Sequence, residues 1–127
     1  MLFRSAPLAD ARRALGALGE RLARQQLEAL GSRIIDVNHR TRWGEIDLLA
    51  LDGDCLVFVE VRARRGDAHG SPAESVVGRK AAKLAALAED YLAEHPEYRD
   101  CRVDVVAVQF STAGRLQSVE VIRDAVS

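Results

Sequence analysis

The sequence contains few of the residues that define several common classes of protein. Only two of its 127 residues are cysteines, Cys55 and Cys101, and they do not form the CxxC pair of a structural zinc site. We therefore interpret both as small hydrophobic side chains. Aromatic residues make up 5% of the chain and do not alternate with basic ones. Any contact with nucleic acid should therefore depend on backbone and shape rather than on base sequence.

Long hydrophobic segments are also absent. No apolar run approaches the roughly 20 residues that cross a bilayer, and the start of the chain lacks the apolar region of a signal peptide. The chain shows no repeat, no low-complexity tract and no linker, and its composition is 48% hydrophobic and 29% charged. These features predict one globular domain over 1–127, located in the cytoplasm and without a membrane partner.

The net charge of −1 conceals an uneven distribution of charge along the chain. Residues 1–43 carry +4, residues 44–61 carry −5, residues 62–83 carry +4 and residues 84–127 carry −4. An acidic segment between two basic ones is compatible with a cation site inside a phosphate-binding surface. A surface that is patchy by chance produces the same pattern, so charge alone does not decide between them.

The hydrophobic pattern predicts seven elements. Leucines at helical spacing (15, 18, 22 and 30) predict a first helix over 7–30 that ends at Gly31. A second helix should follow the capping box Ser71–Glu74 and reach His95. Strands are expected over 32–40, 45–51, 55–64, 102–110 and 116–125. Because the strands are apolar on both faces, the order α-β-β-β-α-β-β predicts an α/β fold with a mixed β-sheet flanked by helices.

Three acids fall within two of these otherwise apolar strands. If Asp52-Gly53 forms a two-residue turn, Asp47 pairs with Phe58 and Glu45 pairs with Glu60. These acids then share one face of the sheet with Arg62, because side chains alternate along a strand. Facing carboxylates are destabilising unless a cation such as Mg²⁺ or Mn²⁺ bridges them. An ion network between Arg62 and the acids is the alternative that this geometry leaves open.

Several segments of the chain together resemble one protein family. The segments GEIDLLA and VFVEVRARR, with ALGERLARQQLEALG and NHR before them and a helix with Lys80 after them, resemble the YraN-like family of bacterial proteins. The resemblance implies a restriction-endonuclease-like fold related to Holliday-junction resolvases. It implies a metal-dependent DNA endonuclease with Mg or Mn as cofactor, acting on branched or other non-canonical DNA in repair or recombination. By analogy with resolvases, it also implies a homodimer.

The resemblance assigns roles to particular residues. Asp47 and Glu60 match the two metal-binding acids of the nuclease motif, and Glu20 matches an acid that resolvase-like members add from a helix. Pairing of Glu20 with Arg24 is its ordinary alternative. Arg62 stands where the wider superfamily has lysine, and an arginine cannot act as a general base. Lys80 is the candidate substitute, so the predicted catalytic residues are Glu20, Asp47, Glu60, Arg62 and Lys80.

Basic residues around these positions are the predicted nucleic-acid contacts, namely Arg40, Arg42, Arg64, Arg65, Arg79 and Lys83. Trp43 is either a base-stacking residue or a cover for a hydrophobic edge. Asp104 is interpreted as a structural partner of a nearby arginine, and the role of Glu45 stays open. The alternative function, from another class, is a non-catalytic nucleic-acid-binding or partner-docking protein that keeps the nuclease fold.

Overall fold

The computed structural model describes residues 8–66 and 79–125 of the chain. Its elements follow the predicted order α-β-β-β-α-β-β, and the predicted cap at Ser71–Glu74 lies outside the described residues. In chain order they are α1 (Leu8–Ala29), β1 (Arg33–Thr41), β2 (Gly44–Asp52), β3 (Cys55–Arg65), α2 (Arg79–Glu94), β4 (Asp100–Phe110) and β5 (Leu116–Ile122).

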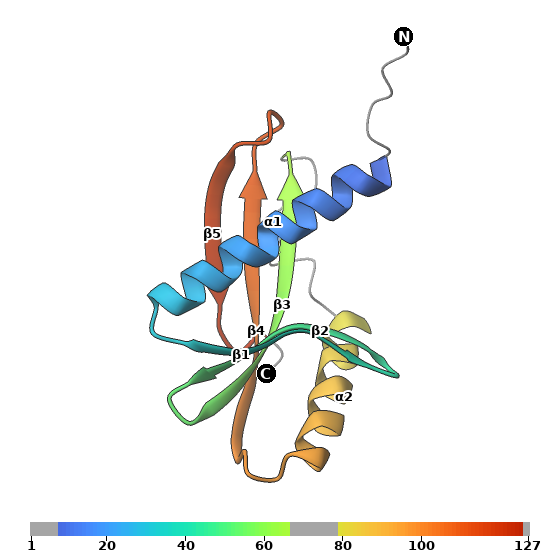
Figure 1. The fold of residues 1–127 in the computed structure, drawn as a ribbon, viewed down its shortest axis with the longest axis vertical. Coiled ribbons are helices and arrows are strands. Elements are labelled where there is room, and N and C mark those ends of the chain that lie inside the picture. The colour runs from blue at the N-terminus through green and yellow to red at the C-terminus, as the bar shows by residue number, and fades with distance from the viewer. Residues whose placement is uncertain (1–7, 67–78, 126–127) are drawn as a thin grey trace.

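The strands form one five-stranded sheet in the order β1-β2-β3-β4-β5. Neighbouring strands are antiparallel except for β3 and β4, which are parallel, so the sheet is mixed. Figure 1 shows α1 crossing the sheet in front of β3, β4 and β5, while α2 lies lower, near the end of the β1–β2 hairpin. The predicted α/β class is confirmed, and the arrangement is consistent with a restriction-endonuclease-like fold. No helix in the described ranges is long and apolar enough to cross a membrane.

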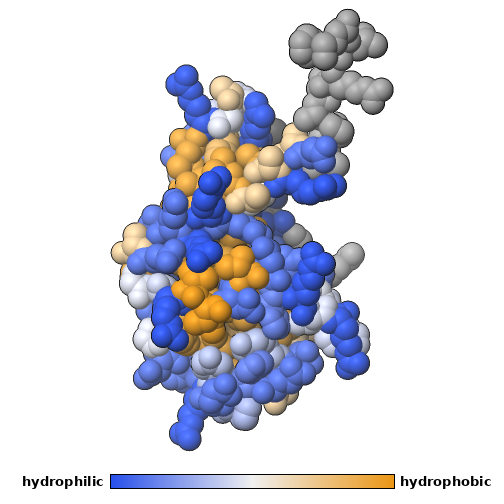
Figure 2. All heavy atoms as spheres, in the orientation of Figure 1, coloured by the Kyte–Doolittle hydropathy of each residue, from blue (hydrophilic) through white to orange (hydrophobic). Residues whose placement is uncertain are grey.

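A hydrophobic core lies on each face of the sheet, which explains why the strands are apolar on both sides. The core against α2 includes Phe58, Leu84, Leu87 and Tyr91. The core against α1 is built from two helical residues and seven strand residues, namely Ala23, Leu27, Leu48, Ala50, Val57, Val59, Val106, Val108 and Phe110. Figure 2 shows hydrophilic residues over most of the visible face, with hydrophobic side chains gathered in smaller areas toward its middle and upper part.

Gly31 terminates helix α1, as the sequence predicted. Gly31 has a φ of +97°, and its amide donates to the carbonyl of Glu28, while the amide of Ser32 donates to the carbonyl of Leu27. This pair of bonds is a Schellman motif, which glycine favours because it has no Cβ. Leu30, the last of the four leucines whose spacing predicted the helix, lies just beyond the end of α1 and is 50% exposed. Cys101 is likewise exposed, whereas Cys55 packs partly against the core.

The register between β2 and β3 differs by two residues from the predicted one. Asp52 pairs with Cys55 and Leu49 pairs with Phe58, so the turn residues are Gly53-Asp54 rather than Asp52-Gly53. Gly53 has a φ of +59°, and a positive φ at the first central residue is what a type II′ turn requires. The predicted pairs Asp47–Phe58 and Glu45–Glu60 were therefore wrong. Because the shift is an even number of residues, the side chains keep the predicted faces.

Candidate functional site

Asp47 lies where the sheet opens. The ladder between β2 and β3 ends at the pair Leu48–Val59, and beyond it Asp47 Oδ2 accepts a hydrogen bond of 2.8 Å from the Val61 amide. On the side of β1, the register continues from Val37–Leu48 to His39–Ile46, and the intervening Asn38, opposite Asp47, has a φ of +52°. The carboxylate thus takes the place of a strand partner for Val61, which fixes its position at the point where the strands separate.

Glycine at position 19 allows α1 to approach this opening. Gly19 is buried against β3, and a Cβ at this position would lie 2.7 Å from the Cβ of Ala63. No larger residue fits without moving the helix, so Gly19 sets the distance between α1 and the sheet. The next residue, Glu20, is therefore carried to the edge of the gap around Asp47.

Three carboxylates meet at this edge. Oxygen atoms of Glu20, Glu45 and Asp47 all lie within 4.8 Å of one another. With its amide nitrogen turned toward them, Asn38 donates to Glu20 Oε1 at 3.1 Å and to Glu45 Oε1 at 2.6 Å. Arg24, the alternative partner of Glu20, instead pairs with Glu28 at 3.6 Å. The structure therefore places Glu20 in the acidic cluster, and it adds Glu45, whose role the sequence had left open.

The ionised forms of Asp47 and Glu20 are disfavoured. The pKa of Asp47 is raised to about 7, mainly by burial and also by the nearby acids Glu60 and Glu20, against the opposing hydrogen bond from Val61. Burial also raises the pKa of Glu20, together with the charge of Glu45, although the bond from Asn38 opposes the shift. Desolvation and like charges both favour the neutral acid, so the cluster is arranged to gain from a bound cation.

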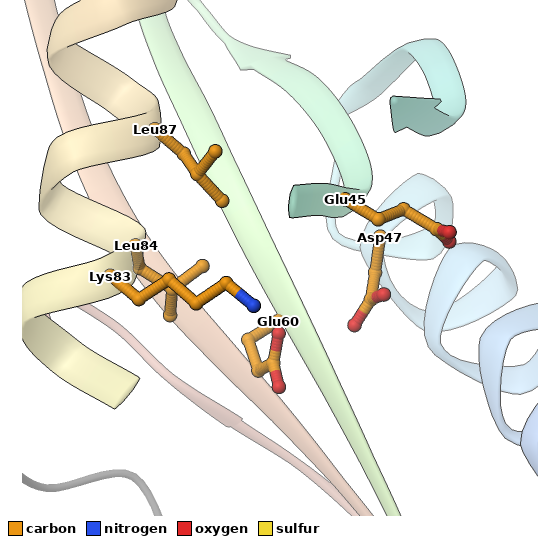
Figure 3. A pocket seen from close by; sticks show the side chains of 6 residues that line it. All are labelled: Glu45, Asp47, Glu60, Lys83, Leu84 and Leu87. Atoms are coloured by element: carbon orange, nitrogen blue, oxygen red, sulfur yellow. The ribbon is translucent and has the colours of Figure 1, made fainter. Parts of the chain in front are cut away.

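Glu60 borders a cavity of about 320 Å³ next to the cluster. Figure 3 shows the carboxylates of Asp47 and Glu60 facing the same space, while that of Glu45 turns toward α1. Lys83 extends from α2 toward Glu60, and Leu84 and Leu87 form the apolar side. The cavity thus brings two of the predicted metal-binding acids together with a lysine.

Lys83 was predicted only as a nucleic-acid contact, but its side chain lies at this cavity. A Cβ on Gly44 would come within 2.8 Å of Lys83 Cε, so the glycine leaves room for the lysine. The side chains of Lys80 and Arg79 lie outside the described residues. Lys83 is therefore the lysine that the structure offers in place of the one absent at position 62. The sequence signal for this position is that Lys83 lies four residues before the buried Leu87, which places both side chains on one face of the helix.

Arg62 contacts Glu60, as the ion-network alternative anticipated. Arg62 Nε lies 3.7 Å from Glu60 Oε1, and the two side chains are only 22% and 16% exposed. This nitrogen is buried and has no hydrogen-bond acceptor within the described part of the chain. A buried donor without an acceptor is costly, and the atom adjoins the face on which the acids converge.

The other predicted nucleic-acid contacts have different surroundings. Arg40 is highly exposed, and its Nε lies 3.8 Å from Glu45 Oε2. The guanidinium of Arg42 lies 4.9 Å from the ring centre of Trp43. Arg65 donates to the carbonyl of Thr112 at 2.8 Å, which fastens β3 to the β4–β5 turn, and Arg64 is partly buried in β3. Arg40 thus lies beside one acid of the cluster, Arg42 lies against Trp43, and Arg65 makes a structural hydrogen bond.

The donor set fits a hard divalent cation. Carboxylate oxygens are the ligands that Mg²⁺ and Mn²⁺ prefer, and a bound cation would offset the repulsion from Glu60 and Glu20 that contributes to the raised pKa of Asp47. Within the described residues, Glu20, Glu45 and Asp47 form a group of three acids whose oxygens could share an ion, and Asp47 also interacts directly with the Glu60 side chain.

Comparison with known proteins places this chain in a family. A family model described as "Uncharacterised protein family UPF0102" matches residues 19–108, a span that contains every residue of the site. The chain belongs to the UPF0102 family. It is 49% identical over 114 residues to a UPF0102 protein of Pelotomaculum thermopropionicum, covering 89% of this chain and 95% of the relative. It is 48% identical over 116 residues to a UPF0102 protein of Frankia casuarinae, covering 91% and 98%. The predicted resemblance to the YraN-like family is thereby confirmed.

Proposed function

We propose that this chain is a metal-dependent endonuclease that hydrolyses DNA phosphodiesters, in repair or recombination. The observation that supports this proposal is the meeting of Glu20 from α1 with Glu45 and Asp47 from β2, at a cavity that also contains Glu60 of β3 and Lys83 of α2. Acids flanked by cations suit a reaction in which a metal ion and a phosphate must be held together.

Asp47, Glu20 and Glu45 are the residues that would hold Mg²⁺ or Mn²⁺, with Glu60 at the adjoining wall of the cavity. A bound ion would neutralise charge on the phosphate and lower the pKa of a coordinated water. The hydrogen bond from Val61 fixes the Asp47 carboxylate, and Asn38 orients both glutamates.

Lys83 and Arg62 are the cations that would face the phosphate. The Lys83 ammonium is the group at the cavity suited to stabilising negative charge as it develops. Arg62 remains protonated and can donate to phosphate oxygens but cannot remove a proton from water. Arg40, Arg42 and Arg64 would contact neighbouring phosphates, each adding to the salt dependence of binding.

The test is incubation of plasmid, branched and flapped DNA with the protein and Mn²⁺ or Mg²⁺. We expect strand scission by the wild type, its loss on addition of a chelator, and its loss in Asp47→Ala. Asp54→Ala is the matched control because it removes an exposed acid from the neighbouring β2–β3 turn. It should cleave as the wild type does. Light scattering of the same samples measures whether the active species is the homodimer that family analogy suggests.

Two results would contradict the proposal. Cleavage that survives Asp47→Ala would identify a contaminating nuclease. Salt-sensitive DNA binding without scission under either metal would identify the chain as the non-catalytic nucleic-acid-binding protein of the alternative hypothesis.

A further inference from the structure

The turn between β1 and β2 exposes the only tryptophan of the chain. Trp43 is 60% exposed. The turn holds it in a defined position, since Thr41 Oγ1 accepts hydrogen bonds of 3.1 Å from the amides of both Trp43 and Gly44. A large aromatic ring is costly to leave in water. At 60% exposure, most of the ring remains open to a ligand even if its covered part packs against a hydrophobic edge.

Trp43 borders an open groove of about 860 Å³ along α2. Ala82 and Ala86, one helical turn apart, line this part of the groove with small apolar side chains. Glu89 and Asp90 lie farther along the helix. Lys83 borders both this groove and the cavity of the acidic site. The groove and the cavity are therefore neighbours on the surface, separated by one lysine side chain.

We propose that Trp43 and this groove form a binding subsite for an unpaired nucleobase, next to the phosphate that the acidic site would hold. The inference rests on the proposed function and adds the class of substrate. An indole ring and two alanines offer flat apolar surface of the kind on which a base stacks. The guanidinium of Arg42, 4.9 Å from the ring centre, covers one face of the indole and leaves the rest for a base.

The charges around the groove favour a nucleotide in one orientation. Lys83 stands at the end toward the acidic site, where the phosphate would lie. Glu89 and Asp90 would repel a phosphate at the opposite end, but their carboxylates can accept hydrogen bonds from the amino groups of a base. The backbone would therefore remain on the side of Lys83 and the base would point along α2.

This arrangement selects against intact duplex. In duplex DNA both faces of each internal base are covered by its neighbours, so a base can stack on Trp43 only after leaving the duplex. Single strands, gaps, flaps and unpaired nucleotides present such a base without that cost. The subsite therefore predicts that the preferred substrate has an unpaired nucleotide beside the reactive phosphate.

The single tryptophan makes the subsite directly measurable, because fluorescence excited selectively at tryptophan, and not at the two tyrosines, reports on Trp43 alone. The experiment uses full-length Asp47→Asn protein, so that the strand stays intact, and four oligonucleotides of one sequence: a single strand, a blunt duplex, a duplex with one unpaired nucleotide, and a single strand with abasic sites. Binding is followed separately by anisotropy of a labelled copy. We expect the single strand and the unpaired nucleotide to quench Trp43, with little quenching by blunt duplex or abasic strand.

Substitutions then test whether the ring carries the affinity. Trp43→Ala should weaken single-strand binding roughly tenfold and leave duplex binding unchanged, while Trp43→Phe should retain most of it. Leu116→Ala, which removes another exposed hydrophobic side chain (48% exposed) from β5, is the matched control and should bind as its parent does.

The outcomes separate this inference from the proposed function. Single-strand binding without a change in Trp43 fluorescence, equal quenching by blunt duplex, or unchanged affinity in Trp43→Ala would each overturn the subsite while leaving the nuclease proposal standing. Absence of binding to every oligonucleotide would overturn the subsite and the proposed DNA substrate together.

Discussion

Two groups of acids at the sheet have opposite surroundings. Asp104, on β4, is 1% exposed, and its two oxygens accept bonds of 3.0 and 3.1 Å from Arg102 Nε. The Asp124 amide donates to it at 2.9 Å, and Arg102 also reaches Asp52 at 2.9 Å. Asp47 is partly buried where β2 and β3 separate, and Glu20, Glu45 and Glu60 are its neighbours. Asp104 is thus paired with a cation, whereas Asp47 is crowded by other acids.

The pKa values of Arg102 and Asp47 differ from their usual values for different reasons. Burial alone would lower the pKa of Arg102, but its bonds to Asp104 and Asp52 outweigh burial and hold the pKa above its usual value. For Asp47, burial and its acidic neighbours act together and raise the pKa to about 7. A paired buried acid holds strands together, as predicted for Asp104. An acid crowded by other acids destabilises the empty site and favours a cation ligand.

The largest expected effect comes from breaking the paired group. Arg102→Ala should lower the free energy of unfolding by about 3–5 kcal/mol, because Asp104 would remain buried as an unpaired charge. Urea unfolding followed by circular dichroism measures the change. Arg24→Ala, which breaks the exposed pair with Glu28, is the control and should cost less than about 1 kcal/mol. If both variants cost the same, the buried network is not the stabilising element described here.

At the acidic site, replacing one carboxyl group by a neutral amide should instead raise the free energy of unfolding. Without metal at pH 8, Asp47→Asn should raise the free energy of unfolding by about 1–3 kcal/mol, since the folded wild type must ionise a group whose pKa is about 7. The unfolded chain releases this proton near the ordinary value of 3.8. Wild-type stability therefore falls as pH rises from about 4 to about 7 and then levels off.

The gain from Asp47→Asn should grow over the same range and be absent at lower pH. Urea unfolding in the presence of a chelator, repeated across this pH range, measures it. A variant that is less stable than the wild type at every pH would show that the ionised Asp47 is adequately paired.

Changing the distance between α1 and the sheet should have a smaller effect on the free energy of unfolding. Gly19→Ala should cost about 1–2 kcal/mol, because the added methyl would overlap Ala63. It should also weaken metal binding by moving Glu20. Gly16→Ala is the matched control on the same helix. Nothing lies within 4 Å of its added methyl, so it should be neutral or stabilising. Equal stability and equal metal affinity of the two variants would show that Gly19 does not position Glu20.

Much of this molecule could be predicted from the order of its residues. Hydrophobic periodicity predicts all seven elements, because strands apolar on both faces and amphipathic helices leave few other arrangements. The convergence of Glu20 with Asp47 was anticipated through the family motif, and alternation along the strands placed Glu45 on the same face as Asp47. The pairing of Asp104 with an arginine followed from the cost of burying a carboxylate.

Other features depended on geometry that no local pattern encodes. The turn formed one residue later than predicted because Gly53 takes the first central position. The opening of the strands at Asp47 depends on a side chain replacing a backbone partner. Lys83 lies at the cavity because the direction of α2 relative to β2 turns this residue toward the acids. These are tertiary relations between distant segments.

The most direct test of this comparison is calorimetric titration of the wild type with Mn²⁺ at pH 8, alongside Asp47→Asn and the exposed-turn control Asp54→Asn. If the acidic cluster is a cation site, the wild type and Asp54→Asn should bind Mn²⁺ saturably and Asp47→Asn should bind at least roughly tenfold more weakly. Absence of saturable binding to the wild type, or equal affinity in Asp47→Asn, would contradict the account.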